Sequence, residues 1–110
     1  MELLRYVTES GKDVFGEWLE SLRDERAAAK VAVRVNRLAA GNFGDCRPVG
    51  GGVWELRIDW GPGYRDYYAM VGRTCVLLRC GGDKRRQTAD IARAIEYLED
   101  YQSRSGDHET

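Results

Sequence analysis

The chain has 110 residues, of which 43% are hydrophobic and 32% are charged, and its formal net charge is −1. This length suits one domain with a single hydrophobic core, and the apolar content together with only two prolines excludes a disordered or fibrous protein. The longest apolar runs, such as CVLL, are far shorter than the roughly 20 residues of a membrane-spanning helix, and no stretch reads as a signal peptide. We therefore expect a soluble cytoplasmic protein that does not contact a membrane.

Cysteine and histidine usage limits the chemistry that the chain can carry. Cys46, Cys75 and Cys80 are an odd number without CxxC spacing, so the sequence predicts reduced thiols and neither a disulfide framework nor a zinc site. The single histidine, His108, lies in the polar segment SRSGDHET, which we expect to be frayed. A folded active site would therefore lack the usual general acid or base, and we expect no metal and no other cofactor.

The charge is unevenly spread along the chain. Residues 73–93 carry six cations and two acidic residues, whereas residues 96–110 carry five acidic residues and one cation. The near-neutral total therefore combines a basic stretch with an acidic tail. A nucleic-acid binder with this total charge needs such an uneven distribution.

The first half of the chain predicts one strand followed by two helices. Residues 2–7 are short, apolar and partly β-prone, which favours a strand. Ser10 followed three residues later by Asp13 resembles a helix start, and the alanine-rich segment 26–42 predicts a second helix that ends at Gly41. The apolar positions at helical spacing are Val14, Phe15, Trp18, Leu19 and Leu22 in the first helix, and Ala28, Val31, Val35 and Leu38 in the second. The sequence thus predicts an N-terminal helical hairpin.

The second half changes to the two-residue period of a sheet. Residues 43–52 form a breaker region, after which VWELRIDW alternates apolar and polar side chains as a half-buried strand does. YRDYYAMV at 64–71 and TCVLLRC at 74–80 follow after short links, which predicts an antiparallel meander. A last helix begins near Thr88 as N-cap. Its apolar face is formed by Ile91, Ala94, Ile95, Leu98 and Tyr101.

These elements together predict an α+β domain. We expect a mainly antiparallel sheet with the helical hairpin and the C-terminal helix on one face. The domain would span residues 1–101, and residues 102–110 would form a polar, flexible tail. Trp18, Trp54 and Trp60 lie on apolar faces of these elements, so we expect all three in the core.

Charged side chains gather on the sheet face that these helices would leave open. Strand alternation places Glu55 and Arg57 there, and the neighbouring strands and the turn that follows add Arg65, Tyr67, Arg79, Lys84, Arg85 and Arg86. Guanidinium groups bind phosphate in a bidentate manner and a tyrosine ring can stack on a base, so this face suits a polyanion. The alternative is that these are the ordinary outward charges of a half-exposed sheet. GGDK lacks the spacing of a phosphate-binding loop, which makes nucleotide hydrolysis a poor alternative.

Three motifs resemble the bacterial toxins of the RelE superfamily. They are ELRI at 55–58, GPGYRDYY at 61–68 and CGGDKRRQ at 80–87, with a helix after the last. The chain is most similar to the phage-derived addiction module killer proteins near the HigB toxins, over residues 1 to about 101. The resemblance implies a RelE-like, or microbial-ribonuclease-like, fold.

The resemblance also implies an mRNA interferase that cuts messenger RNA in the ribosomal A site. Its partners would be the ribosome, mRNA and a cognate antitoxin, a small helix-turn-helix protein from the same operon. In such enzymes the 2′-hydroxyl of the RNA attacks the adjacent phosphate, and cations stabilise the developing charge. Matched by motif, the catalytic cations are Arg65, Lys84 and Arg57, in that order of preference.

Two departures from the family pattern leave the acid and the base unassigned. Glu55 stands where some relatives have a basic residue, and Asp90 stands where some have tyrosine or histidine. Glu55 is the first hypothesis for the general base, and Asp90 is the second. The expected RNA-binding residues are Arg79, Arg85, Arg86 and Tyr67. An alternative function also stays open, namely a non-catalytic member that binds its antitoxin, with or without RNA, and does not cleave.

Overall fold

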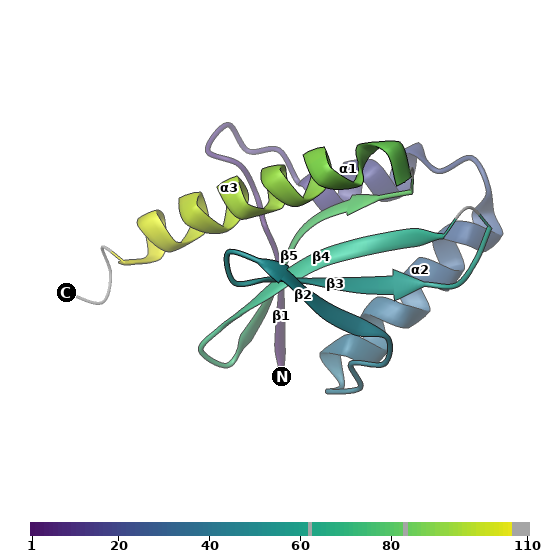
Figure 1. Ribbon diagram of the computed structural model, residues 1–110, viewed down its shortest axis with the longest axis horizontal. Coiled ribbons are helices and arrows are strands. Elements are labelled where there is room, and N and C mark those ends of the chain that lie inside the picture. The colour runs from purple at the N-terminus through teal and green to yellow at the C-terminus, as the bar shows by residue number, and fades with distance from the viewer. Residues whose placement is uncertain (62, 83, 107–110) are drawn as a thin grey trace.

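A computed structural model describes residues 1–61, 63–82 and 84–106, with the backbone alone for residues 105 and 106. The elements in chain order are β1 (Glu2–Arg5), α1 (Val14–Ser21), α2 (Glu25–Ala39), β2 (Cys46–Gly50), β3 (Val53–Ile58), β4 (Tyr64–Val71), β5 (Thr74–Gly81), a 3₁₀ turn (Lys84–Arg86) and α3 (Gln87–Gly106) (Figure 1). The strands form one sheet in the order β1-β5-β4-β3-β2, in which only β1 and β5 are parallel. The predicted α+β class and the mainly antiparallel sheet are confirmed.

The meander of β3, β4 and β5 forms the centre of the sheet, as the two-residue period predicted. Its register pairs Arg57 with Arg65 across β3 and β4, and Tyr67 with both Glu55 and Arg79. Cross-strand partners point to the same side of a sheet. The charged side chains that the alternation placed together therefore do share one face.

The edge strand β2 was not predicted, because residues 43–52 contain a proline and four glycines in a segment interpreted as a breaker. β2 pairs antiparallel with β3, and its other edge has no partner strand in the described part of the chain. Proline is tolerated on such an edge, where a ladder hydrogen bond is not needed. Gly50, Gly51 and Gly52 all have positive φ, at 108°, 62° and 83°, and they make the tight return to β3.

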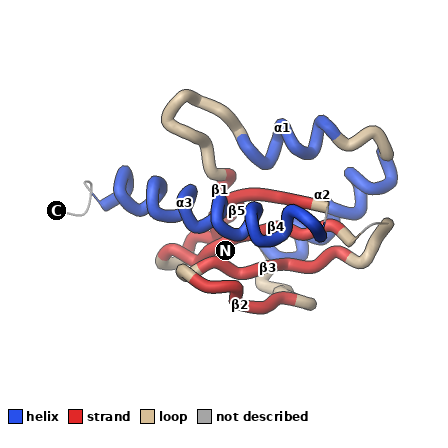
Figure 2. The backbone as a smooth tube through the Cα atoms, turned by 45° about the horizontal axis from the view of Figure 1, so that its top comes forward, coloured by secondary structure: helices blue, strands red, loops and turns tan. Residues whose placement is uncertain are grey.

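The helices lie on both faces of the sheet, so the prediction that they share one face is wrong. One face packs against α1 and α2 through Phe15, Val31, Val35, Leu38, Leu56, Ile58, Tyr68, Cys75, Leu77 and Cys80. The other face packs against α3 through Tyr6, Val14, Val53, Tyr67, Ala69, Val76, Leu78, Ala94 and Leu98. Figures 1 and 2 show α2 and α3 separated by the sheet. The physical reason is that β4 and β5 are apolar at successive positions, as in a strand buried on both sides.

The helix ends differ in detail from those predicted. Asp13 is the N-cap of α1, where its side chain accepts a hydrogen bond from the Gly16 amide at 3.1 Å. Asp24 caps α2 in the same way. Thr88 is not an N-cap, because the 3₁₀ turn leads directly into α3 at Gln87. α3 also continues through residues 102–106 of the expected tail, whereas residues 107–110 lie outside the described part.

The tryptophans are less uniformly buried than expected. Trp18 and Trp60 are partly buried against the core, but Trp54 is 39% exposed because no helix covers its part of the sheet. No helix within residues 1–61, 63–82 and 84–106 is long and apolar enough to cross a membrane.

Candidate functional site

A cleft of about 420 Å³ opens where β3 ends and β4 begins, next to the 3₁₀ turn. Its lining residues are Asp45, Arg57, Ile58, Asp59, Gly61, Gly63, Tyr64, Arg65 and Lys84. Three separate parts of the sequence thus bring Arg57, Arg65 and Lys84, the three expected catalytic cations, to one cleft. These cations outnumber the two carboxylates of the lining, Asp45 and Asp59, which favours an anionic ligand.

Arg57 and Arg65 are direct cross-strand partners, and like charges in that position repel one another. A carboxylate lies beside each of them. Nε of Arg57 is 3.8 Å from Oδ2 of Asp45, and the Arg57 amide donates to the backbone oxygen of Asp45 at 2.9 Å. Asp45 therefore stands at the cleft wall next to a cation, with an exposed carboxylate.

Arg65 is the most enclosed of the three cations, with a side chain only 10% exposed. Its Nε lies 3.7 Å from Oε2 of Glu55, and its Nη1 donates to the Gly63 carbonyl oxygen at 3.4 Å. Within the described residues, Nε has no hydrogen-bond partner. Nε is buried on the side of Glu55, whereas the residue as a whole lines the cleft, where a guanidinium can bind an acceptor such as a phosphate oxygen.

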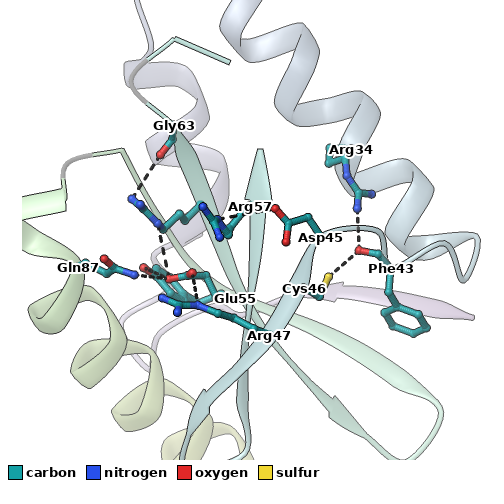
Figure 3. Close-up of polar contacts among 11 residues, drawn as sticks. Arg34, Phe43, Asp45, Cys46, Arg47, Glu55, Arg57, Gly63 and Gln87 are labelled. Atoms are coloured by element: carbon teal, nitrogen blue, oxygen red, sulfur yellow. Dashed lines mark hydrogen bonds and ion pairs between the residues drawn. The ribbon is translucent and has the colours of Figure 1, made fainter. Parts of the chain in front are cut away.

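Glu55 is fully buried and holds this arrangement together. Its Oε1 accepts from Nε of Arg47 at 3.0 Å, and its Oε2 accepts from Nε2 of Gln87 at 2.8 Å and from the Tyr67 hydroxyl at 3.1 Å. Figure 3 shows Arg47 and Gln87 converging on the Glu55 carboxylate. Both oxygens are thus occupied, and Glu55 is not among the residues that line the cleft.

Tyr67 does not present its ring to a ligand. The residue is 1% exposed, because α3 covers this face of the sheet. Burial, and then the neighbouring Glu55 charge, raise the pKa of its hydroxyl, so the phenol remains a neutral hydrogen-bond donor. The expectation of an open, RNA-binding sheet face is therefore corrected: α3 covers the part of this face around Tyr67, and the cleft lies at the end of the face.

The remaining predicted RNA-binding residues lie around the start of α3. Arg79 donates from Nε to Oδ1 of Asp90 at 2.9 Å, and Asp90 is only 6% exposed. Both residues line a second hollow of about 300 Å³, together with Arg86. Arg85 is exposed on the same 3₁₀ turn. Asp90, like Glu55, is thus engaged with an arginine and lies outside the first cleft.

Four residues at or behind the cleft were not predicted. Asp45 and Asp59 supply the carboxylates that line it, while Gln87 and Arg47 anchor Glu55 from behind. Asp45 and Arg47 lie in the segment interpreted as a breaker, so no strand pattern indicated which way they point. Gln87 closes the CGGDKRRQ motif, but its contact with a residue 32 positions earlier exists only in the folded chain.

The described part of the chain was compared with the side-chain groups that bind metal ions. Across residues 1–61, 63–82 and 84–106, no group of three or more histidine, cysteine, aspartate or glutamate side chains is arranged to hold an ion.

Comparison with known proteins adds one relationship. No protein-family model matches the chain. A protein of Haemophilus influenzae that is described only as uncharacterized is 49% identical over 80 residues, which are 73% of this chain and 81% of that protein. An identity this high over most of both chains indicates common descent and a shared fold. The chain therefore belongs to the same family as this H. influenzae protein.

Proposed function

We propose that the protein is the toxin of a type II toxin–antitoxin pair, a ribosome-dependent endoribonuclease that cleaves mRNA in the ribosomal A site of the cytoplasm. The observation that carries the proposal is the meeting of Arg57, Arg65 and Lys84 in one cleft. The order of the elements, with two helices before the meander and a helix after it, supports a RelE-like fold. The cognate antitoxin, a helix-turn-helix protein, would hold the enzyme inactive.

The cleft suits cleavage by the RNA's own 2′-hydroxyl. Attack on the adjacent phosphate forms a bond from the 2′-oxygen to phosphorus and breaks the bond to the 5′-oxygen, through a phosphorane-like state with additional negative charge. The 2′-hydroxyl gives its proton to a base, and the leaving 5′-oxygen takes up a proton from an acid or from water. Arg65 is held in place by Glu55 and Gly63 before any substrate arrives, so its charge needs little reorganisation. Lys84 is exposed on the 3₁₀ turn, where its flexible ammonium can follow the phosphate.

Asp45 is the best-placed proton acceptor for the 2′-hydroxyl. Its carboxylate lines the cleft beside Arg57, whereas those of Glu55 and Asp90 are buried in contact with arginines. A general base has to come within hydrogen-bond reach of the proton that it removes. Asp59 also lines the cleft and is the natural comparison in a mutational test.

The experiment is induced expression without antitoxin, followed by mapping of mRNA 5′ ends. We expect new ends at codons with the wild-type protein and none with Arg65→Ala or Lys84→Ala. Arg93→Ala is the matched control, because Arg93 is an exposed cation on α3 that pairs with Glu96 and lies away from the cleft. Undiminished cleavage by a correctly folded Arg65→Ala variant, verified by circular dichroism, would refute the role of Arg65. The absence of new 5′ ends with the wild-type protein would refute the proposed function.

A second candidate function is a non-catalytic family member that binds its antitoxin, with or without RNA. The observation that favours it is Glu55, whose buried carboxylate neutralises part of the charge of Arg65 and Arg47. In this case mRNA 5′ ends would be unchanged by the wild-type protein, while the purified protein would still bind its antitoxin. The same end-mapping experiment therefore separates the two functions.

A further inference from the structure

An apolar groove of about 550 Å³ lies on the face of the sheet opposite α3, beyond the C-terminal end of α2. Its lining residues are Phe43, Gly44, Cys46, Trp54, Tyr68 and Met70, and none of these six side chains is charged. Phe43 and Trp54 are each 39% exposed and Met70 is 38% exposed. Soluble monomers seldom expose large apolar side chains next to one another unless the surface binds something.

The groove follows from the alternation of the strands. Trp54 and Tyr68 are cross-strand partners, and Met70 lies two residues after Tyr68, so all three point to the same face. The ring of Phe43 stacks on that of Tyr68 with centroids 6.4 Å apart. α2 covers the neighbouring part of this face, over Leu56 and Ile58, and ends before it reaches the groove. The layer of helices on this face is thus incomplete.

A basic stripe runs along α2, and Arg34 and Arg37 lie in the half of the helix that is nearer to the uncovered area. Arg26, Lys30, Arg34 and Arg37 are spaced i, i+4, i+8 and i+11 along α2, which places them on one side of the helix. The only acidic residue of α2 is Glu25, in its first turn. After Glu25, this side of α2 therefore carries only cations and uncharged residues.

Arg34 ties the stripe to the groove itself. Its guanidinium donates to the carbonyl oxygens of Phe43 and Asn42 at 2.6 and 3.3 Å, as Figure 3 shows for Phe43. It also lies so close to Gly44 that a side chain at that position would collide with it. The positive charge of Arg34 therefore lies at the edge of a groove whose lining side chains are uncharged.

We propose that this groove docks an amphipathic helix of a partner protein, with an apolar face seated on Phe43, Trp54 and Met70 and acidic residues facing the α2 stripe. We assign a helix because the groove offers the exposed apolar side chains of Phe43, Trp54 and Met70 to the apolar face of a helix. An added strand would instead pair with the outer edge of β2, whose Cys46 lines the groove. An RNA strand fits less well, since a lining without charge has nothing to neutralise phosphates. The inference goes beyond the proposed function and holds whether or not the cleft cleaves RNA.

The groove also adjoins the cleft. Gly44 and Cys46 line the groove, while Asp45 between them lines the cleft and pairs with Arg57 (Figure 3). The Phe43 carbonyl oxygen accepts from both Arg34 and the Cys46 thiol, at 2.6 Å each, which holds this short segment in place. A helix seated in the groove would therefore rest against the backbone that carries Asp45.

The test is photo-crosslinking in the producing cells, with p-benzoylphenylalanine in place of Met70. The control carries the same group in place of Val7, which is 41% exposed and lies beside Arg104 of α3, away from the groove. We expect Met70 to crosslink to a protein segment with apolar residues at helical spacing and an excess of acidic residues, and Val7 not to do so. Crosslinks from Met70 to RNA, to a second copy of this chain or to a segment without this pattern would overturn the proposal, as would a yield no greater than that from Val7.

A second measurement tests the charge complementarity. The crosslinked segment is synthesised as a peptide, and its affinity is compared for the wild type and for Arg37→Glu, at an exposed position in the last turn of α2. Exposed ion pairs contribute little individually, so we expect binding that is about threefold weaker after this charge reversal. Arg37→Lys should bind as the wild type does. Equal affinity of all three proteins would refute the acidic partner, provided that thermal unfolding shows all three to be folded.

Discussion

Oε2 of Glu55 lies 3.7 Å from Nε of Arg65, and neither side chain is more than 10% exposed. The carboxylate therefore compensates a buried cation that the sheet brings to the cleft. A single acidic residue on β3 thus sets the position of a cation on β4, while Arg47, Tyr67 and Gln87 hold the acidic residue in turn. This relationship leads directly to a prediction about stability.

Glu55→Ala should lower the free energy of unfolding by about 3 kcal/mol, because removing one partner of a buried ion pair leaves the other charge uncompensated. Urea denaturation followed by circular dichroism measures the change. Asp59→Ala serves as a comparison, since Asp59 is an exposed residue of the cleft lining and should change stability little. Equal stability of Glu55→Ala and the wild type would contradict the positioning role.

Tyr67→Phe separates a buried hydrogen bond from a base-stacking role. The substitution keeps the ring and removes the hydroxyl that donates to Glu55, so we expect a loss of about 1 kcal/mol in stability. Affinity for a single-stranded RNA oligonucleotide should not change, because the ring does not reach solvent. Fluorescence anisotropy measures the affinity, and a severalfold loss in the folded variant would show that the ring contacts RNA after all.

Asp45→Asn should reduce the rate of RNA cleavage by about 100-fold if Asp45 accepts the proton of the 2′-hydroxyl. RNA affinity should stay the same or increase, because the substitution removes a negative charge beside Arg57. Single-turnover cleavage on programmed ribosomes gives the rate, and filter binding gives the affinity. A larger effect of Asp59→Asn than of Asp45→Asn would move the assignment to the other carboxylate of the cleft.

Asp66 should make folding stability depend on pH. It is fully buried, its Oδ1 accepts from the Cys80 thiol at 2.5 Å, and Oδ2 has no partner within the described residues. Burial raises its pKa from 3.8 to about 7, against the smaller opposing effects of Cys80 and Arg34. The native state then binds a proton that the unfolded state has released, so stability decreases as the pH rises from about 4 to about 7.

The check is urea denaturation of the wild type and of Asp66→Asn at several pH values between 4 and 8. Each unit of pKa shift corresponds to about 1.4 kcal/mol, so the wild type should lose several kcal/mol over this range. Asp66→Asn should have a flatter profile, because the amide does not titrate. Parallel profiles for the two proteins would show that Asp66 is not the group responsible.

The local sequence pattern determined the elements of the meander and which of their side chains share a face. In VWELRIDW and YRDYYAMV, strand alternation and cross-strand pairing are local properties, and they were enough to place Glu55, Arg57, Arg65 and Tyr67 together. The same pattern could not show what covers that face. α3 lies over Tyr67 and Glu55, so two residues predicted to meet RNA are buried.

The sequence by itself determined an α+β domain, its central strands and the three cations that line the cleft. Only the tertiary structure decided the rest: that α3 takes the face opposite α2, that β2 completes the sheet, and that Asp45 and not Glu55 faces the cleft. The physical reason is the separation along the sequence of the residues on which each feature depends. Strand and helix periods depend on neighbours a few residues away, whereas the burial of Glu55 depends on Gln87, which is 32 residues further along the chain and meets it only after the chain folds.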